Sequence, residues 1–165
     1  MPISFGISFT KTPMNQARAL VHIYTDGSVG VSTGAVEMGQ GVNTKMLQIA
    51  AQTFSIDPKH IKLESTNTTR VANTSPSAAS ATADLNGKAL EKACNALMKR
   101  LKSCAANHLN VSLVDVTLKN GLIYTNGNKT DLTWDQLVTM AFLKRICLTE
   151  NGHYATLTIH FDMKK

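Results

Sequence analysis

The sequence is poor in the residues that mark the more specialised classes of protein. Aromatic residues make up 5% of its 165 residues, and Trp134 is the single tryptophan. There are three cysteines, Cys94, Cys104 and Cys147, with no CxxC pair and no Cys/His pair at metal-ligand spacing. We therefore expect no zinc or iron–sulfur site within this chain. Cys94 and Cys104 fall in a long helical pattern and are predicted to be small buried hydrophobic residues.

Long hydrophobic runs are also missing. The longest fall far short of the roughly 18 residues that a membrane span needs, so no membrane contact is expected. The first residues, MPISFGISFTKTP, lack the basic start and apolar core of a secretory signal peptide. The cytoplasm is the expected location.

A continuous basic surface is not indicated, although the formal net charge is +6. The basic residues are scattered, and the densest cluster is KRLK at residues 99–102. Aromatic residues that could stack on bases do not alternate with them. We interpret the cluster as a solvated helix face and expect no nucleic-acid partner.

What the sequence does contain is an alternation of strand and helix patterns, with 43% hydrophobic residues available for a core. Alternating apolar residues and turn signals predict strands at 3–10, on both sides of the Asp26-Gly27-Ser28 turn, at 61–66, in a second hairpin around Asn120-Gly121, and from 153 onward. Helical periodicity predicts helices over 42–56, over 83–109, and after Thr133 as N-cap. Asp57-Pro58 is expected to stop the first helix, and Gly87 in the second suggests close packing against another backbone.

This order of elements predicts an α+β fold with mixed sheets and packed helices. We assign residues 1–165 to one domain. Its first part, 1–110, carries the two unusual turns described next. Its second part, 111–165, holds a hairpin, a helix and an extended segment.

Two polar stretches stand directly before predicted helices. The Met-Gly-Gln-Gly turn (residues 38–41) places one glutamine between two glycines, and the Ser/Ala-rich loop (residues 66–83) is full of small and hydroxyl side chains. A helix N-terminus presents unpaired N–H groups and a partial positive charge, which suit an anion. Ser77, Ser80 and Thr82 add hydroxyls that can bind phosphate oxygens. The pattern is compatible with a phosphate-type ligand, although such stretches are more often ordinary helix caps.

Ordinary helix caps are the alternative interpretation of both stretches. For the longer helix the N-cap is either Ser75, before Pro76, or Ser80, before a helix that starts at Ala81. Neither stretch is a P-loop or a dinucleotide fingerprint, since GxxxxGK and GxGxxG are both missing.

No catalytic set of side chains stands out. Glu37, a lone acid before the Met-Gly-Gln-Gly turn, is interpreted as a surface residue, and Asp84 as an acid that favours a helix N-terminus. The five histidines are dispersed, and His22 is placed in the first hairpin. The chain looks able to hold a ligand but not to transform one.

Taken together, these segments resemble the molybdenum-cofactor-binding subunit of xanthine dehydrogenases, in the molybdenum hydroxylase family that includes aldehyde oxidases. The resemblance spans residues 5 to about 162 and is less distinctive over 102–148. It is carried by FGISFT, LVHIYTDGSVGVSTGAVEMGQGVNTKMLQIAA, NTSPSAASATADLNGKAL and GHYATLTIHFD. The Met-Gly-Gln-Gly turn and the Ser/Ala-rich loop, in this order, make it specific.

The resemblance implies that both segments grip molybdopterin, a pyranopterin with a phosphate tail that carries molybdenum through a dithiolene. Gln40 would hydrogen-bond the cofactor through its amide. Backbone of Met38, Gly39 and Gly41 would line the cofactor. N–H groups and hydroxyls of Ala79, Ser80 and Thr82 would bind it. Ala78 and Ala79 would lie close to the metal without ligating it.

The sequence departs from the family pattern at two positions. Ala83 stands where relatives often have a hydroxyl residue, which removes one possible phosphate donor. Leu157 replaces a common proline, so the local loop is expected to differ while the metal site is not.

The resemblance also implies what lies elsewhere. The family's general-base glutamate, its 2Fe-2S clusters and its FAD domain have no counterpart here, so we expect a fragment of a larger, oligomeric enzyme that is inactive alone. Its partners would be the rest of the molybdenum subunit and the iron–sulfur and flavin domains. Family chemistry would hydroxylate an electron-poor carbon with oxygen from water, on hypoxanthine or xanthine.

Three alternatives stay open at this point. The enzyme could be aldehyde oxidase-like and act on an aldehyde or another heterocycle. The chain could be a non-catalytic module for a phosphorylated small molecule. It could also be a structural domain in which both turns are ordinary caps.

Overall fold

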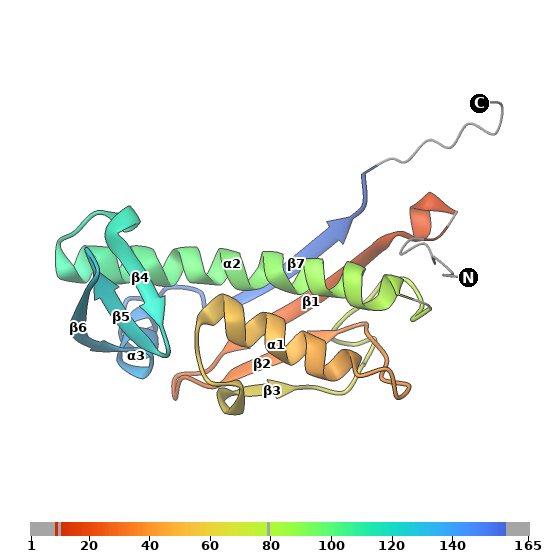
Figure 1. Ribbon diagram of the computed structural model, residues 1–165, viewed down its shortest axis with the longest axis horizontal. Coiled ribbons are helices and arrows are strands. Elements are labelled where there is room, and N and C mark those ends of the chain that lie inside the picture. The colour runs from red at the N-terminus through yellow and green to blue at the C-terminus, as the bar shows by residue number, and fades with distance from the viewer. Residues whose placement is uncertain (1–8, 10, 79, 158–165) are drawn as a thin grey trace, which may run out of the picture.

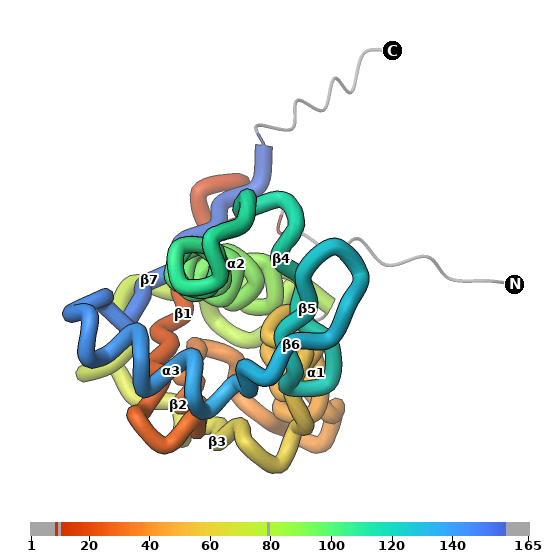
Figure 2. Tube along the Cα trace, turned by 90° about the vertical axis from the view of Figure 1, so that its left-hand side faces the viewer, coloured from red at the N-terminus to blue at the C-terminus, as the bar shows by residue number. Residues whose placement is uncertain are grey.

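The computed structural model describes residues 9, 11–78 and 80–157. Its main layer is a four-stranded sheet in the order β3-β2-β1-β7, and a three-stranded sheet, β4-β5-β6, lies at one end of the molecule. The helices α1 and α2 cover the same face of the larger sheet, as the view along α2 in Figure 2 makes plain. The predicted α+β class is confirmed.

The first predicted hairpin is confirmed and forms the centre of the larger sheet. β1 (Gln16–Ile23) and β2 (Val29–Thr33) are antiparallel, with Val21 opposite Val31. Their turn is closed by Tyr24 N–H donating to the Ser28 carbonyl at 2.8 Å. β3 (Ile61–Leu63) adds to β2 in parallel, and β7 (Thr149–Ala155) adds to β1 in antiparallel orientation.

Helix α1 (Val42–Phe54) packs its apolar stripe into the core. Its buried residues recur at helical spacing: Val42, Met46, Ala50, Ala51 and Phe54. The helix ends two residues earlier than predicted, because Ser55 adopts a left-handed conformation with φ of 55°. Asp57-Pro58 then starts the short 3-10 helix η2 (Pro58–His60), in which Asp57 accepts the Lys59 N–H at 2.9 Å.

Helix α2 (Ala81–Leu109) runs along the whole molecule in Figure 1. It begins two residues earlier than the periodicity predicted. The sequence suggested that Gly87 packs against another backbone, and this is wrong. A Cβ on Gly87 would lie 2.8 Å from Ile49 Cδ1, so the glycine makes room for a side chain of α1. The tight backbone contact is at Gly152 of β7, where a Cβ would collide with the Ala89 carbonyl of α2.

The second hairpin prediction is incomplete, because this region forms three strands. β4 (Val116–Lys119), β5 (Leu122–Thr125) and β6 (Asn128–Thr133) make an antiparallel meander, and Asn126-Gly127 supplies its second turn. β6 was missed because its sequence, NKTDLT, buries one apolar side chain, Leu132. Helix α3 (Trp134–Leu143) follows, and the predicted N-cap Thr133 is confirmed as part of a capping box with Gln136.

Smaller differences concern strand ends and cysteines. β3 stops at Leu63, three residues before the predicted end, and β7 starts at Thr149, four residues before the predicted extended segment. The strand predicted over 3–10 lies outside the described residues, except for Phe9. Cys94 and Cys104 are buried as predicted, and burial raises the pKa of the Cys94 thiol to about 12.

Candidate functional site

The two polar segments meet at one end of the molecule. The segment before α1 and the segment before α2 lie at the same end in Figure 1, opposite the β4–β6 meander. The Val36 N–H donates to the Ser77 hydroxyl at 2.8 Å, and the Thr66 hydroxyl donates to the Ala35 carbonyl at 3.0 Å. These bonds tie the Ser/Ala-rich loop to the chain that leads into the Met-Gly-Gln-Gly turn. Residues 41 and 31 positions apart in the chain therefore form one surface.

The Glu37 carboxylate organises the N-terminus of α1. Its Oε1 accepts the N–H groups of Gly39 and Gly41, both at 2.9 Å, and its Oε2 accepts the Asn43 N–H at 3.0 Å. Backbone bonds from Asn43, Gly41 and Gly39 hold the pKa of the Glu37 carboxyl below its usual range. Glu37 is exposed, as expected of a surface residue, but its carboxylate also accepts three backbone N–H groups, which the sequence did not indicate.

Gln40 is folded back onto the turn in which it lies. Its Nε2 donates to the Val36 carbonyl at 2.8 Å, and its Oε1 accepts the Met38 N–H at 2.5 Å. Gly39 and Gly41 have φ of 94° and 74°, which explains the two glycines beside this glutamine. The N–H groups of Met38, Gly39 and Gly41 thus all donate within the chain.

The N-terminus of α2 has fewer hydrogen-bonded polar groups than that of α1. Ser80 occupies the N-cap position with a helical backbone, and its exposed side chain makes no cap bond. Thr82 in the first turn is 4% exposed, and its hydroxyl finds no partner among the described residues. Ser75, the alternative cap, lies outside the helix, and its hydroxyl donates to the Met14 carbonyl. Ala78 is half-buried, and the predicted contact at Ala79 falls outside the described residues.

Asn86 joins α2 to the end of β2 and was not predicted from the sequence. It is 3% exposed, accepts the Gly34 N–H at 3.1 Å and donates to the Thr82 carbonyl at 3.0 Å. A local signal for this role is missing, because Gly34 lies 52 positions away in the chain. Asn86 fixes the first turn of α2 against the strand that leads to the other polar segment.

These observations decide where an anionic group fits. At α1 the helix N-terminus is already occupied by the Glu37 carboxylate. At α2 a buried hydroxyl without a partner, at Thr82, and an uncommitted hydroxyl, at Ser80, stand at the positive end of a 29-residue helix. The residues present therefore suit a ligand with a phosphate at α2, and Gln40 can contact the same ligand by exchanging its bonds to Val36 and Met38.

A cleft of about 570 Å³ opens beside the Met-Gly-Gln-Gly turn. Glu37 and Glu64 are the ionisable residues in its lining, and Glu64 pairs with Arg70 at 2.9 Å and Lys62 at 3.1 Å. Val36 at its rim and Met38 next to it are 42% and 66% exposed. The surface around the turn thus combines polar and apolar groups.

Two further observations bear on ligands and surroundings. Within the described part of the chain, no three His, Cys, Asp or Glu side chains gather where they could hold a metal ion. None of the helices described there has both the length and the apolar character of a membrane span.

Comparison with known proteins places this geometry in a family. The family model described as "Molybdopterin cofactor-binding domain" matches residues 1–165. The chain is 39% identical to a xanthine dehydrogenase of Dictyostelium discoideum and 52% identical to a xanthine dehydrogenase/oxidase of Rattus norvegicus, each over 99% of the chain. It is also 37% identical over its whole length to aldehyde oxidase 3 of Rattus norvegicus. The chain spans about a tenth of the length of these relatives.

Solved structures share the fold at lower identity. A carbon monoxide dehydrogenase from Oligotropha carboxidovorans superposes with a TM-score of 0.77 at 22% identity, over 85% of this chain and 18% of that one. Quinoline 2-oxidoreductase from Pseudomonas putida superposes with a TM-score of 0.75 at 20% identity, over 85% of this chain and 19% of that one. The chain therefore belongs to the family of molybdopterin cofactor-binding domains, as its resemblance to the xanthine dehydrogenases had implied.

Proposed function

We propose that this chain supplies part of the molybdopterin site of a xanthine dehydrogenase-like oxidoreductase. The observation that carries the proposal is the N-terminus of α2, where the buried Thr82 hydroxyl has no partner among the described residues and the Ser80 side chain makes no cap bond. The Val36–Ser77 bond holds this helix start beside the Gln40 turn. The proposed contacts are Met38, Gly39, Gln40, Gly41, Ala78, Ala79, Ser80 and Thr82.

Each segment has its own task in this proposal. Thr82 and Ser80 hydroxyls, with the first N–H groups of α2, bind the phosphate tail, because a helix N-terminus and hydroxyl donors both favour a dianion. Gln40 exchanges its bonds to Val36 and Met38 for bonds to the pterin. Ala78 and Ala79 have small side chains and leave room beside the metal.

The chain's own residues bind and orient, and the reactive centre belongs to the cofactor. When bound, molybdopterin supplies the molybdenum at which a substrate carbon is hydroxylated with oxygen from water. We assign the general base, a glutamate, to a part of the enzyme beyond these 165 residues. The 2Fe-2S clusters and FAD that carry electrons onward belong there too.

Purines are the proposed substrates, with hypoxanthine and xanthine first, because xanthine dehydrogenases match nearly the whole chain. The aldehyde oxidase relative, at 37% identity, supports an aldehyde as the second candidate. The proposed partners are the rest of the molybdenum subunit and the iron–sulfur and flavin domains, in a cytoplasmic oligomer.

The test is to capture the native protein from its source cells with an antibody to this segment. Its mass and molybdenum content are then measured, and its turnover of xanthine is compared with that of a panel of aldehydes. We expect a chain or complex several times larger than 165 residues, with about one molybdenum per copy and preference for the purine. A free 165-residue protein without molybdenum would contradict the proposal.

A further inference from the structure

The N-terminus of α1 binds an anionic group of the chain itself, the Glu37 carboxylate. The first N–H groups of a helix lack partners within the helix and attract negative charge. Here one side chain, Glu37, accepts the N–H of Asn43, the second residue of α1, at 3.0 Å, and the N–H groups of Gly39 and Gly41 just before the helix at 2.9 Å. A carboxylate bound in this way by N–H groups occupies the place that a phosphate would need.

The same bonds fix the shape of the turn. Gly39 and Gly41 both adopt left-handed conformations, and a single oxygen, Oε1 of Glu37, accepts the N–H groups of both. Asn43, one residue into α1, donates to the second oxygen. Glu37 therefore connects both glycines and the start of the helix through one carboxylate. Gln40 lies between the two glycines that Glu37 binds.

We infer that Glu37 is the positioning residue of the Met-Gly-Gln-Gly turn, and that its carboxylate excludes phosphate from the N-terminus of α1. The inference rests on the proposed function, because positioning matters for the ligand that Gln40 contacts. It also fixes the orientation of the cofactor. The cofactor's phosphate binds at α2, and the turn at α1 offers the Gln40 amide and backbone carbonyls.

Inorganic phosphate is the probe that tests this exclusion. Backbone amide signals of the ¹⁵N-labelled 165-residue chain are followed while phosphate replaces chloride at constant ionic strength and pH 7. In the unmodified chain we expect the amides of Gly39, Gly41 and Asn43 not to respond. In Glu37→Ala the same three amides should shift in a saturable way, because the helix N-terminus is vacated.

A matched control removes a carboxylate elsewhere. Glu91 on α2 pairs with Lys88 at 2.7 Å on an exposed face and does not line the cleft beside the turn. Glu91→Ala makes the same change in net charge, so we expect the three turn amides to stay insensitive to phosphate. A response of these amides in the unmodified chain, or none in a folded Glu37→Ala variant, would overturn the inference.

A second measurement needs no variant and decides the matter if Glu37→Ala does not fold. Lowering the pH protonates Glu37 and weakens its bonds, so the Gly39 and Gly41 amides should titrate together at a pH below the ordinary pKa of a glutamate. Glu64 is the other ionisable residue in the cleft lining, and its pairing with Lys62 and Arg70 also lowers its pKa. Its titration should appear in the Glu64 amide and in those of its partners. Glycine amides that do not titrate with an acidic group would reject the positioning role.

The two proposals fail separately in this design. The amides of Thr82 and Asp84 report phosphate at α2, and so test the proposed function. The amides of Gly39, Gly41 and Asn43 report the role of Glu37. A silent α2 with a responsive Glu37→Ala turn would contradict phosphate binding at α2 and leave the positioning role intact.

Discussion

At the scale of single residues, Thr82 is the least satisfied side chain of the candidate site. An unpaired buried hydroxyl costs about 1–3 kcal/mol of stability. Thr82→Val replaces that hydroxyl with a methyl group of similar volume. We expect the free energy of unfolding of the 165-residue chain to rise by about 1 kcal/mol, while molybdenum per copy of the native protein falls several-fold. Denaturant unfolding and metal analysis measure the two effects.

Thr74 provides the matched control. Its hydroxyl is also buried without a partner, but its side chain packs against Gly34 and not in the first turn of α2. Thr74→Val should raise stability and leave the molybdenum content unchanged. Equal molybdenum loss in both variants, or none in Thr82→Val, would remove Thr82 from the site.

Sequence reasoning singled out some residues of the candidate site and did not single out others, for a physical reason. Gln40, Ser80 and Thr82 are marked locally, by glycines or by a helix start, and these signals span a few positions. Glu37 and Asn86 act through their partners, and the Asn86 partner is 52 positions away. A lone acid and a helical asparagine carry no local sign of such contacts.

At the scale of elements, α2 and β7 approach closely at Gly152, where an added Cβ would meet backbone atoms of α2. Gly152→Ala would place a Cβ against the Ala89 carbonyl, and backbone cannot yield as a side chain does. We expect a loss of about 3 kcal/mol in the free energy of unfolding. Gly87→Ala is the control, because its Cβ meets the end of the flexible Ile49 side chain and Ala favours the helix. It should change stability by less than about 1 kcal/mol, and similar losses in both would refute the distinction.

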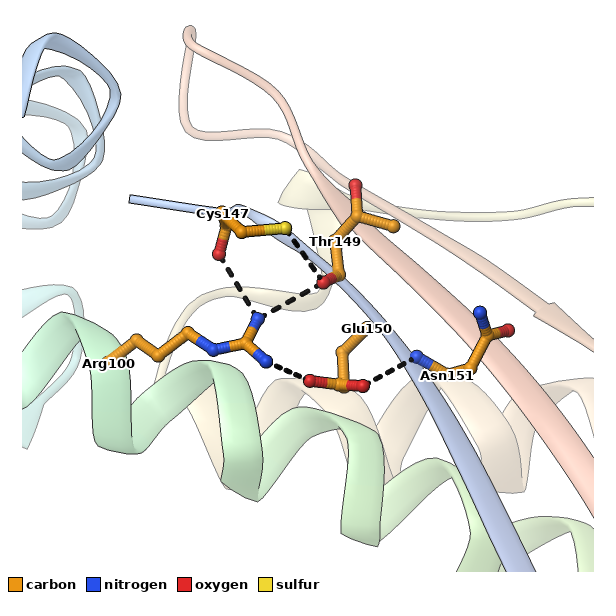
Figure 3. A network of polar contacts seen from close by, with 5 residues as sticks. All are labelled: Arg100, Cys147, Thr149, Glu150 and Asn151. Atoms are coloured by element: carbon orange, nitrogen blue, oxygen red, sulfur yellow. Dashed lines mark hydrogen bonds and ion pairs between the residues drawn. The ribbon is translucent and has the colours of Figure 1, made fainter. Parts of the chain in front are cut away.

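The free edge of β7 is closed by side chains. The Ile23 N–H donates to the Leu148 carbonyl, so alternate residues of β7 face β1 and those between face outward. Arg100 donates to the outward carbonyls of Cys147 and Thr149 and pairs with Glu150, which in turn accepts the Asn151 N–H (Figure 3). Lys92 donates to the His153 carbonyl at 3.2 Å. Covered in this way, the edge offers few groups to another strand.

Removing the covering side chains should therefore promote self-association. We expect Lys92→Ala with Arg100→Ala to shift the isolated chain from monomer toward larger species in light scattering. Lys99→Ala with Lys102→Ala removes the same charge from α2 outside this network and serves as control. If the two double variants associate equally, net charge and not the strand edge explains the effect.

Elements with dense local signals were predicted, and those without were not. The Asp-Gly turn predicts the first hairpin from a few residues. The helical periodicity of α1, α2 and α3 is likewise visible within each segment. β6 did not, because five of its six residues are polar and it is held by pairing with β5. The start of β7 was missed because Gly152, a residue type that weakens a strand pattern, lies within it. Glycine is needed at this position because a Cβ would collide with the Ala89 carbonyl of α2.

At the scale of the whole molecule, the candidate site stands at one end and on one side. The Met-Gly-Gln-Gly turn and the start of α2 form a surface on which Met38 is 66% exposed and Ser80 is open. Cofactor sites are normally concave and bury most of their ligand. This chain spans about a tenth of the length of its relatives, and in the proposed function it contributes one part of such an enclosure. Under the proposed function, the remaining contacts come from the rest of the enzyme.

The isolated 165 residues are therefore expected to bind without catalysing. We predict no urate formation from xanthine by the purified chain, even with molybdenum cofactor added, because the proposed function assigns the general base and the opposite side of the site to other parts of the enzyme. The native enzyme from the same cells, assayed at equal molybdenum, is the positive control. Turnover by the chain alone would mean that its own residues supply the base, and Glu37 and Glu64 in the cleft would be the first to replace with glutamine. If the chain forms only part of the site, we expect weak phosphate binding at Thr82 and no turnover of xanthine.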